Sequence, residues 1–187
     1  MALQLPIPKE RTIYLAQQVD QSSINSITKS IVEINEDDEY ISKLSLIHGF
    51  EYKPKPIELY IDSYGGYVYQ CLGLLNIMQK SKVPVDTIVT GCAMSCGFLI
   101  AISGHKRYCF EGSTFMYHQV SSGAIGKIKD MEEDVIETKR LQKIIEGHTL
   151  SKTKITSKDL EKCYNEKRDW YMTAKQAHKY GVVDLIV

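Results

Sequence analysis

The chain has 187 residues, of which 43% are hydrophobic and 25% are charged, as is ordinary for a globular protein large enough to bury a core. Basic and acidic side chains each number 23, so the formal net charge is zero and no electrostatic attraction to nucleic acid or to an anionic membrane is predicted. No apolar run is long enough to span a bilayer, and the start "MALQLPIPKER" lacks the pattern of a signal peptide. We therefore expect a cytoplasmic protein.

The first predicted elements are a short strand in "TIYLAQQV" and a helix over residues 22–35. In that helix isoleucines recur at helical spacing behind a serine cap. Residues 36–56 are mixed in charge and are broken by Gly49, Pro54 and Pro56. We expect this segment to be a long connection that includes about one helical turn.

The remainder of the chain alternates strand and helix patterns at crossover lengths. The predicted strands cover residues 57–62, 85–93, 106–110, 114–120 and 182–187. The predicted helices cover residues 68–80, 98–103, 127–150, 156–165 and 173–181. This alternation predicts an α/β fold on a largely parallel sheet.

Five cysteines are scattered along the chain without a C-x-x-C pair. Because their number is odd and their spacing fits neither a disulfide framework nor a zinc site, we expect reduced residues of the core.

Chemistry in α/β sheets gathers where strands end and helices begin, and two such places stand out. The first is "DSYGG" at residues 62–66, where paired glycines allow a ligand to approach the backbone. The same glycines are equally consistent with a tight turn. The second is Ser95 at the start of a helix, where free N–H groups stabilise negative charge, although serine is also a common N-cap. The local pattern is not G-x-S-x-G, so it gives no support to a nucleophile elbow.

A nucleophilic serine needs a base and an orienting acid. Among five histidines, His118 alone lies in an apolar strand pattern, where its ring requires partners, though a satisfied core histidine is the commoner explanation. Asp169 is a candidate acid, and a surface ion pair with Arg168 explains it equally well. The other histidines are expected on the surface or in the irregular connection: His48, His105, His148 and His178. From these residues alone, a site of Ser95, His118 and Asp169 is allowed but not required.

Four segments in this order resemble the proteolytic subunit of Clp protease, the ClpP family of serine peptidases: "YIDSYGG", "GCAMSCGFLIA", "FMYHQV" and "RDWYMTAKQAHKYGVVD". The similarity runs from "KERTIYL" to "YGVVDLIV", nearly the whole chain. It implies a single domain over residues 1–187 with the ClpP/crotonase-like ββα superhelix. The head would cover about 9–120 and 150–187, and a protruding handle helix about 121–150.

The resemblance also implies roles for particular residues. Ser95 would be the nucleophile, His118 the general base and then acid, and Asp169 the group that holds the imidazole. The backbone N–H groups of Gly66 and Cys96 would form the oxyanion hole. Substrate would be bound by Gly65, Ser122 and Gly123. The family needs no metal and no other cofactor.

The resemblance further implies an assembly in which the handles interdigitate between two stacked heptameric rings. The active sites would be sealed in a chamber fed by a hexameric AAA+ unfoldase, so that unfolded polypeptides are cleaved to short peptides. Neither nucleic acid nor a membrane is an expected partner.

Four departures from the family pattern identify a divergent member, of the kind found in phages or as accessory paralogues. Only eight residues precede "KERTIYL", where the family has a longer segment that forms pore loops, which weakens the expectation of ATPase gating. The connection 36–56 is longer than usual and lies near the expected ATPase docking site. Tyr64 stands where proline is usual, and "VSSG" follows His118 and Gln119 in place of a proline and paired glycines.

Other functions remain as alternatives. A viral ClpP-like protease would process capsid or scaffold proteins during head maturation, without an ATPase. A crotonase would bind acyl-CoA, but it has no need for Ser95, His118 and Asp169 together. A Ser–Lys signal-peptide peptidase would need a membrane anchor. A purely structural ring subunit would not react with an acylating probe.

Overall fold

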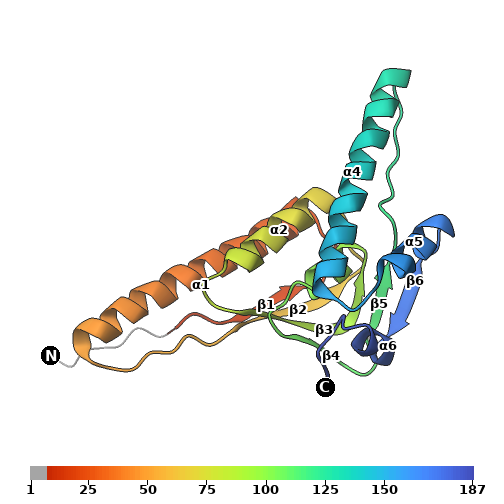
Figure 1. Ribbon diagram of the computed structural model, residues 1–187. Coiled ribbons are helices and arrows are strands. Elements are labelled where there is room, and N and C mark those ends of the chain that lie inside the picture. The colour runs from red at the N-terminus through yellow and green to blue at the C-terminus, as the bar shows by residue number, and fades with distance from the viewer. Residues whose placement is uncertain (1–7) are drawn as a thin grey trace.

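A computed structural model of the chain describes residues 8–187, which form a seven-stranded sheet with helices packed against it (Figure 1). Five strands follow one another in parallel, in the order β1 (Thr12–Leu15), β2 (Ile57–Ser63), β3 (Val85–Met94), β4 (Arg107–Cys109) and β7 (Leu185–Ile186). Beyond the part of β3 that pairs with β4, β5 (Thr114–Tyr117) is parallel to β3, and β6 (Trp170–Thr173) is antiparallel to β5. The predicted α/β class is confirmed.

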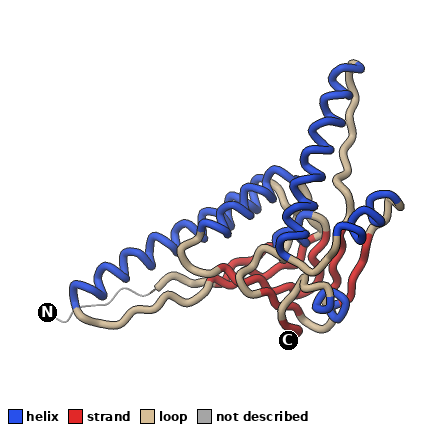
Figure 2. The backbone as a smooth tube through the Cα atoms, in the orientation of Figure 1, coloured by secondary structure: helices blue, strands red, loops and turns tan. Residues whose placement is uncertain are grey.

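The helices of the described residues are α1 (Gln21–His48), α2 (Val68–Lys80), α3 (Cys96–Ala101), α4 (Ile128–Lys152), α5 (Ser157–Asn165) and α6 (Ala174–Lys179). α1 and α2 run side by side over the sheet, and the far end of α1 projects away from it (Figure 1). α4 projects in another direction, and the loop that precedes it runs beside it out to the tip (Figure 2). The head of the molecule therefore carries two protrusions. None of these helices is both long and apolar enough to cross a membrane.

The pattern of buried residues in β2 and β3 reflects which faces of these strands are covered. β3 buries its first five residues in succession, as expected of a strand whose two faces are both covered. β2 instead buries alternate residues, so that one of its faces points into the core. The core is aliphatic with two large aromatic side chains, Phe98 and Phe115, both fully buried.

The prediction of an irregular connection over 36–56 was wrong for most of its length, because α1 continues to His48. The buried stripe that begins at Ile24 continues through Asp38 and Ile41, and Glu39 forms an i,i+4 ion pair with Lys43. The helix-breaking residues all follow His48. Gly49 ends the helix in the left-handed conformation, with φ +73°.

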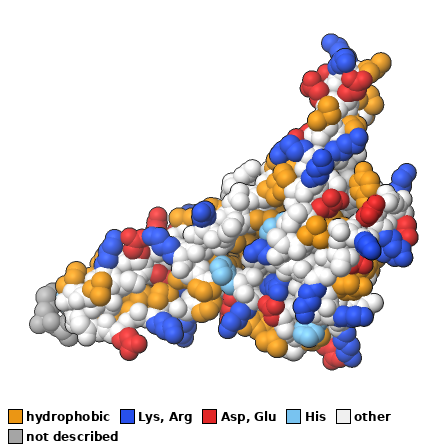
Figure 3. Space-filling view, in the orientation of Figure 1, with side chains coloured by type: hydrophobic (Ala, Val, Ile, Leu, Met, Phe, Trp, Pro, Cys, Tyr) orange, Lys and Arg blue, Asp and Glu red, His pale blue; other side chains and the backbone are white. Residues whose placement is uncertain are grey.

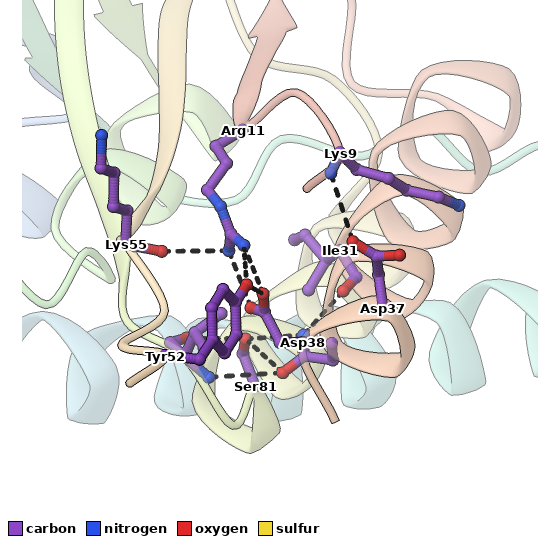
Figure 4. A network of polar contacts seen from close by, with 10 residues as sticks. Lys9, Arg11, Ile31, Asp37, Asp38, Tyr52, Lys55 and Ser81 are labelled. Atoms are coloured by element: carbon purple, nitrogen blue, oxygen red, sulfur yellow. Dashed lines mark hydrogen bonds and ion pairs between the residues drawn. The ribbon is translucent and has the colours of Figure 1, made fainter. Parts of the chain in front are cut away.

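A buried ion pair fixes α1 to the start of β1 (Figure 4). Asp38 is 3% exposed and accepts hydrogen bonds from the Arg11 guanidinium and from the Tyr52 hydroxyl. Arg11 also donates to the carbonyl oxygen of Lys55 at 3.1 Å. The network thus joins β1, α1 and the loop that returns from the helix tip.

The structure also differs from the sequence-based expectations at two histidines. The strand that contains "TFMY" ends at Tyr117, so His118 lies just beyond it rather than inside it. His148 is half-buried, not a solvated surface residue, and its Nε2 lies 2.7 Å from Ser103 Oγ. The expectation of a short segment before "KERTIYL" concerns residues that lie almost wholly outside the described part of the chain.

Candidate active site

Ser95 lies at the turn between β3 and α3, and its backbone is unusual. Its φ is +53° and its ψ is −120°, a conformation that residues other than glycine seldom adopt. The Ser95 N–H donates to the carbonyl oxygen of Met116 on β5 at 2.9 Å. Its side chain makes no capping hydrogen bond, so the alternative that Ser95 is an ordinary N-cap is wrong. Strained backbone of this kind clusters at functional sites.

The Ser95 hydroxyl meets the imidazole of His118, with 2.8 Å between Oγ and Nε2. The register of the sheet explains this contact. Met94 on β3 is the partner of Met116 on the parallel strand β5, so Ser95 and His118 follow the carboxyl ends of neighbouring strands. Parallel strands bring such ends together at one edge.

Asp169 approaches the other nitrogen of the same ring. It precedes β6, whose Trp170 is the partner of Tyr117 in the antiparallel pairing, and this places it beside His118. Its Oδ1 lies 3.7 Å from His118 Nδ1, which is an ion-pair distance but longer than a hydrogen bond. Its side chain is 53% exposed, whereas that of His118 is 24% exposed. Arg168 pairs with Glu166 at 3.7 Å, so the alternative of a surface pair with Asp169 is not what forms.

The glycine turn after β2 lies against this serine. Gly65 and Gly66 have φ values of +97° and +154°, which other residues rarely adopt. A Cβ on Gly65 would lie 2.6 Å from the Met94 carbonyl oxygen and 2.8 Å from the Ser95 Cβ. The close approach of the two turns therefore requires glycine at position 65.

Ser95, His118, Gly66 and Cys96 line one cavity of about 250 Å³. Most of its wall is apolar and comes from Val68, Leu99, Met116, Tyr117, Val120 and Ile145. Sequence reasoning missed this wall, because its members look like ordinary core positions on four different elements. Tyr117 belongs to this wall, and its burial raises the pKa of its phenol.

Gln142 was also missed. It is 8% exposed on α4, and its side-chain oxygen accepts a hydrogen bond from the Val120 N–H at 2.8 Å. It thereby fixes the loop that follows His118. One signal of this role was present in the sequence: Gln142 is a polar residue that directly follows Leu141, a member of the apolar stripe of the helix.

None of the three predicted substrate-binding residues lines this cavity. Gly65 lies next to Ser95 but does not line the cavity, and its carbonyl oxygen accepts from the Val19 N–H at 2.8 Å. Ser122 and Gly123 are exposed in the loop beside α4, and Ser122 Oγ lies 3.2 Å from Thr138 Oγ1.

A second serine–histidine contact, Ser103 with His148, differs in its chemistry. The Ser103 hydroxyl donates to the Leu99 carbonyl oxygen at 2.7 Å, and His148 Nε2 lies at the same distance from the hydroxyl oxygen. Burial lowers the pKa of His148. Among the described residues, no carbonyl oxygen holds the Ser95 hydroxyl in this way, and the hydroxyl faces His118.

The described residues contain no cluster of three or more His, Cys, Asp or Glu side chains suited to a metal. The five cysteines are free and buried, as predicted for reduced core residues.

A profile of the Clp protease family matches residues 3–187. The chain belongs to the Clp protease family. Among its relatives, the ATP-dependent Clp protease proteolytic subunits of Dehalococcoides mccartyi strains BAV1 and CBDB1 are each 30% identical over 182 residues, which is 96% of this chain and 82% of theirs. The resemblance predicted from the four motifs is confirmed. Members of the Clp protease family are serine peptidases, and they usually assemble as ring oligomers with Clp ATPases.

Proposed function

We propose that this protein is a serine endopeptidase in which Ser95 is the nucleophile, His118 the general base and Asp169 the group that orients the imidazole. One observation carries the proposal. Ser95 is held in a strained turn with its hydroxyl 2.8 Å from a histidine nitrogen, inside a cavity. A serine, a base within hydrogen-bond reach and an acid behind the base form the arrangement used for acyl transfer.

In the reaction, Ser95 Oγ attacks the scissile carbonyl carbon while His118 Nε2 takes its proton. The negative charge on the carbonyl oxygen is stabilised by the backbone N–H groups of Gly66 and Cys96, whose residues line the same cavity. His118 then gives the proton to the leaving amine, and water hydrolyses the acyl-enzyme by the reverse route. Asp169 must close the 3.7 Å gap to hydrogen-bond the imidazolium, a tightening that is common when substrate binds.

The apolar residues of the cavity wall support an apolar side chain next to the scissile bond. The exposed loop with Ser122 and Gly123 would pair with extended substrate, and Gly65 would shape the turn that faces it. No cofactor takes part.

The proposed assembly is two stacked heptameric rings joined through the α4 handles, in the cytoplasm, with an AAA+ unfoldase that supplies unfolded chains. In its support, the part of α4 beyond the head exposes an apolar patch of Ile128, Met131, Val135 and Ile136. Figure 3 shows hydrophobic side chains along this protrusion.

A second candidate is a viral head-maturation protease with the same chemistry but without an ATPase. The observation that favours it is the extension of α1 to His48, because it changes the surface near the expected ATPase docking site. The two candidates differ in whether addition of an AAA+ unfoldase is needed for digestion of a folded capsid or scaffold protein.

The test of the shared chemistry is a fluorophosphonate probe with intact-mass detection. We expect one adduct, which maps to Ser95, is absent in Ser95→Ala and persists in Ser103→Ala, the matched variant of the other serine–histidine contact. Hydrolysis of a short fluorogenic peptide should fall by about 10⁴-fold or more in Ser95→Ala. An adduct on Ser103, or full activity in Ser95→Ala, would refute the proposal.

A further inference from the structure

Two cysteine thiols lie together beneath the proposed oxyanion hole. Cys71 is in the first turns of α2, and Cys96 is the first residue of α3, directly after Ser95. They are 0% and 1% exposed. The Cys71 Sγ lies 3.6 Å from the carbonyl oxygen of Cys96, and the two thiols are within hydrogen-bonding reach of each other.

The Cys96 thiol also contacts the other side of the oxyanion hole. Its Sγ donates to the carbonyl oxygen of Gly66 at 3.2 Å. The thiol therefore links the backbones of the two residues whose N–H groups would bind the oxyanion. Because Cys96 lines the 250 Å³ cavity, a water-sized oxidant that reaches Ser95 also reaches this residue.

The two cysteines differ in acidity and in their access to the cavity, which Cys96 lines and Cys71 does not. The hydrogen bond from Cys71 lowers the pKa of Cys96, against the effect of burial. The same hydrogen bond, together with burial, raises the pKa of Cys71. Cys96 lines the cavity and Cys71 does not, so Cys96 is the first to react and Cys71 is placed to resolve it.

We propose that Cys71 and Cys96 are a redox modification site, at which hydrogen peroxide forms a reversible disulfide that inactivates the oxyanion hole. Cys96 reacts with peroxide to give a sulfenic acid and one water. The Cys71 thiol attacks that sulfur, releases a second water and forms the disulfide. Two thiols are thus oxidised as one peroxide is reduced, and an added dithiol reverses the step. The effect on hydrolysis rests on the proposed function, whereas formation of the disulfide does not.

The bond would alter the site because a disulfide brings its sulfurs to about 2.05 Å. The Cys96 sulfur must leave the Gly66 carbonyl oxygen and move toward α2, taking the start of α3 with it. Loss of one oxyanion donor slows hydrolases by about 10²–10³-fold, so we expect about 100-fold slower peptide cleavage in the oxidised protein.

The experiment treats the full-length protein with increasing hydrogen peroxide, blocks the remaining thiols by alkylation and maps disulfides by mass spectrometry. We expect a Cys71–Cys96 linked peptide whose yield follows the loss of peptide cleavage, and recovery of cleavage with dithiothreitol. Cys71→Ala should keep its basal activity, form no linked peptide and lose activity that dithiothreitol does not restore, because the unresolved sulfenic acid oxidises further. Cys109→Ala, a buried cysteine on β4, should behave as the wild type.

Absence of the linked peptide at doses that inactivate the enzyme would overturn the proposal, and so would a linked protein with undiminished cleavage. If Cys71→Ala does not fold, Cys71→Ser is used, and the wild-type map alone still decides whether the bond forms. Failure of the proposed function is recognised separately, because the reduced protein would then be inactive before any oxidant is added.

Discussion

Ser95 is distinguished from the chain's other serines by its backbone and by the direction of its hydroxyl. A positive φ prevents the side chain from capping α3, and the hydroxyl is left to face His118. Ser103 has a histidine at nearly the same distance, but it donates its proton to a carbonyl oxygen one helical turn earlier. The difference between the proposed nucleophile and a structural hydroxyl is therefore conformational here.

The turn at Gly65 is expected to be intolerant of a side chain. In Gly65→Ala, the Cβ meets the Met94 carbonyl and Ser95, and a positive φ adds strain of about 1–3 kcal/mol. We expect a lower free energy of unfolding by that amount and slower fluorophosphonate labelling, measured by denaturant titration and by mass spectrometry. The control is Gly73→Ala, whose Cβ meets nothing within 4 Å in α2 and should be neutral or stabilising. Equal behaviour of the two variants would contradict the close approach.

Among the elements, α1 carries a buried charged residue, Asp38. Burial alone would raise the pKa of Asp38, but hydrogen bonds from Arg11 and Tyr52 outweigh it and lower the pKa. A carboxyl with a lowered pKa contributes stability above about pH 4, its unfolded value, and this contribution is lost as the pH falls through the folded value.

Asp38→Asn should therefore destabilise the protein by about 3 kcal/mol at neutral pH, because it leaves the half-buried Arg11 without its counter-charge. The difference from the wild type should shrink below about pH 4. Urea titrations at several pH values measure both effects. The matched variant is Glu36→Gln, an exposed acid two residues earlier on the same helix, which should change stability by less than about 0.5 kcal/mol. A loss in Asp38→Asn that does not vary with pH would argue against the ion pair as its cause.

At the scale of the whole molecule, the α4 protrusion offers a surface for contact between copies of the chain. The α4 handle exposes apolar side chains at its outer half, while its inner half is anchored by Leu141 and Ile145 in the head. A contiguous apolar patch on a protrusion is typical of an interface.

Val135→Glu places a charge in that patch. Val135 is 51% exposed, so the substitution leaves the packing of the head unchanged. We expect native mass spectrometry to show fourteen subunits for the wild type and seven or fewer for the variant, since a buried unpaired carboxylate opposes ring stacking. Glu133→Gln, an exposed neighbour, should keep the wild-type mass. A double ring in Val135→Glu would exclude this patch from the ring contact.

The sequence by itself determined the family, the α/β class and most of the helices, because periodicity, caps and motif order are local properties of the chain. It failed for residues 36–48, where charge was taken as a sign of a loop although no helix breaker occurs before Gly49. It also placed His118 within a strand that ends one residue earlier.

Only the tertiary structure decided how the candidate groups meet. Ser95 and His118 are 23 residues apart, and their 2.8 Å contact depends on the register of β3 against β5. The wall of the cavity, the 3.7 Å gap to Asp169 and the meeting of Cys71 with Cys96 likewise join different elements. Such contacts are set by sheet register and helix packing, which no local pattern specifies, and for that reason they could not be predicted from the order of the residues.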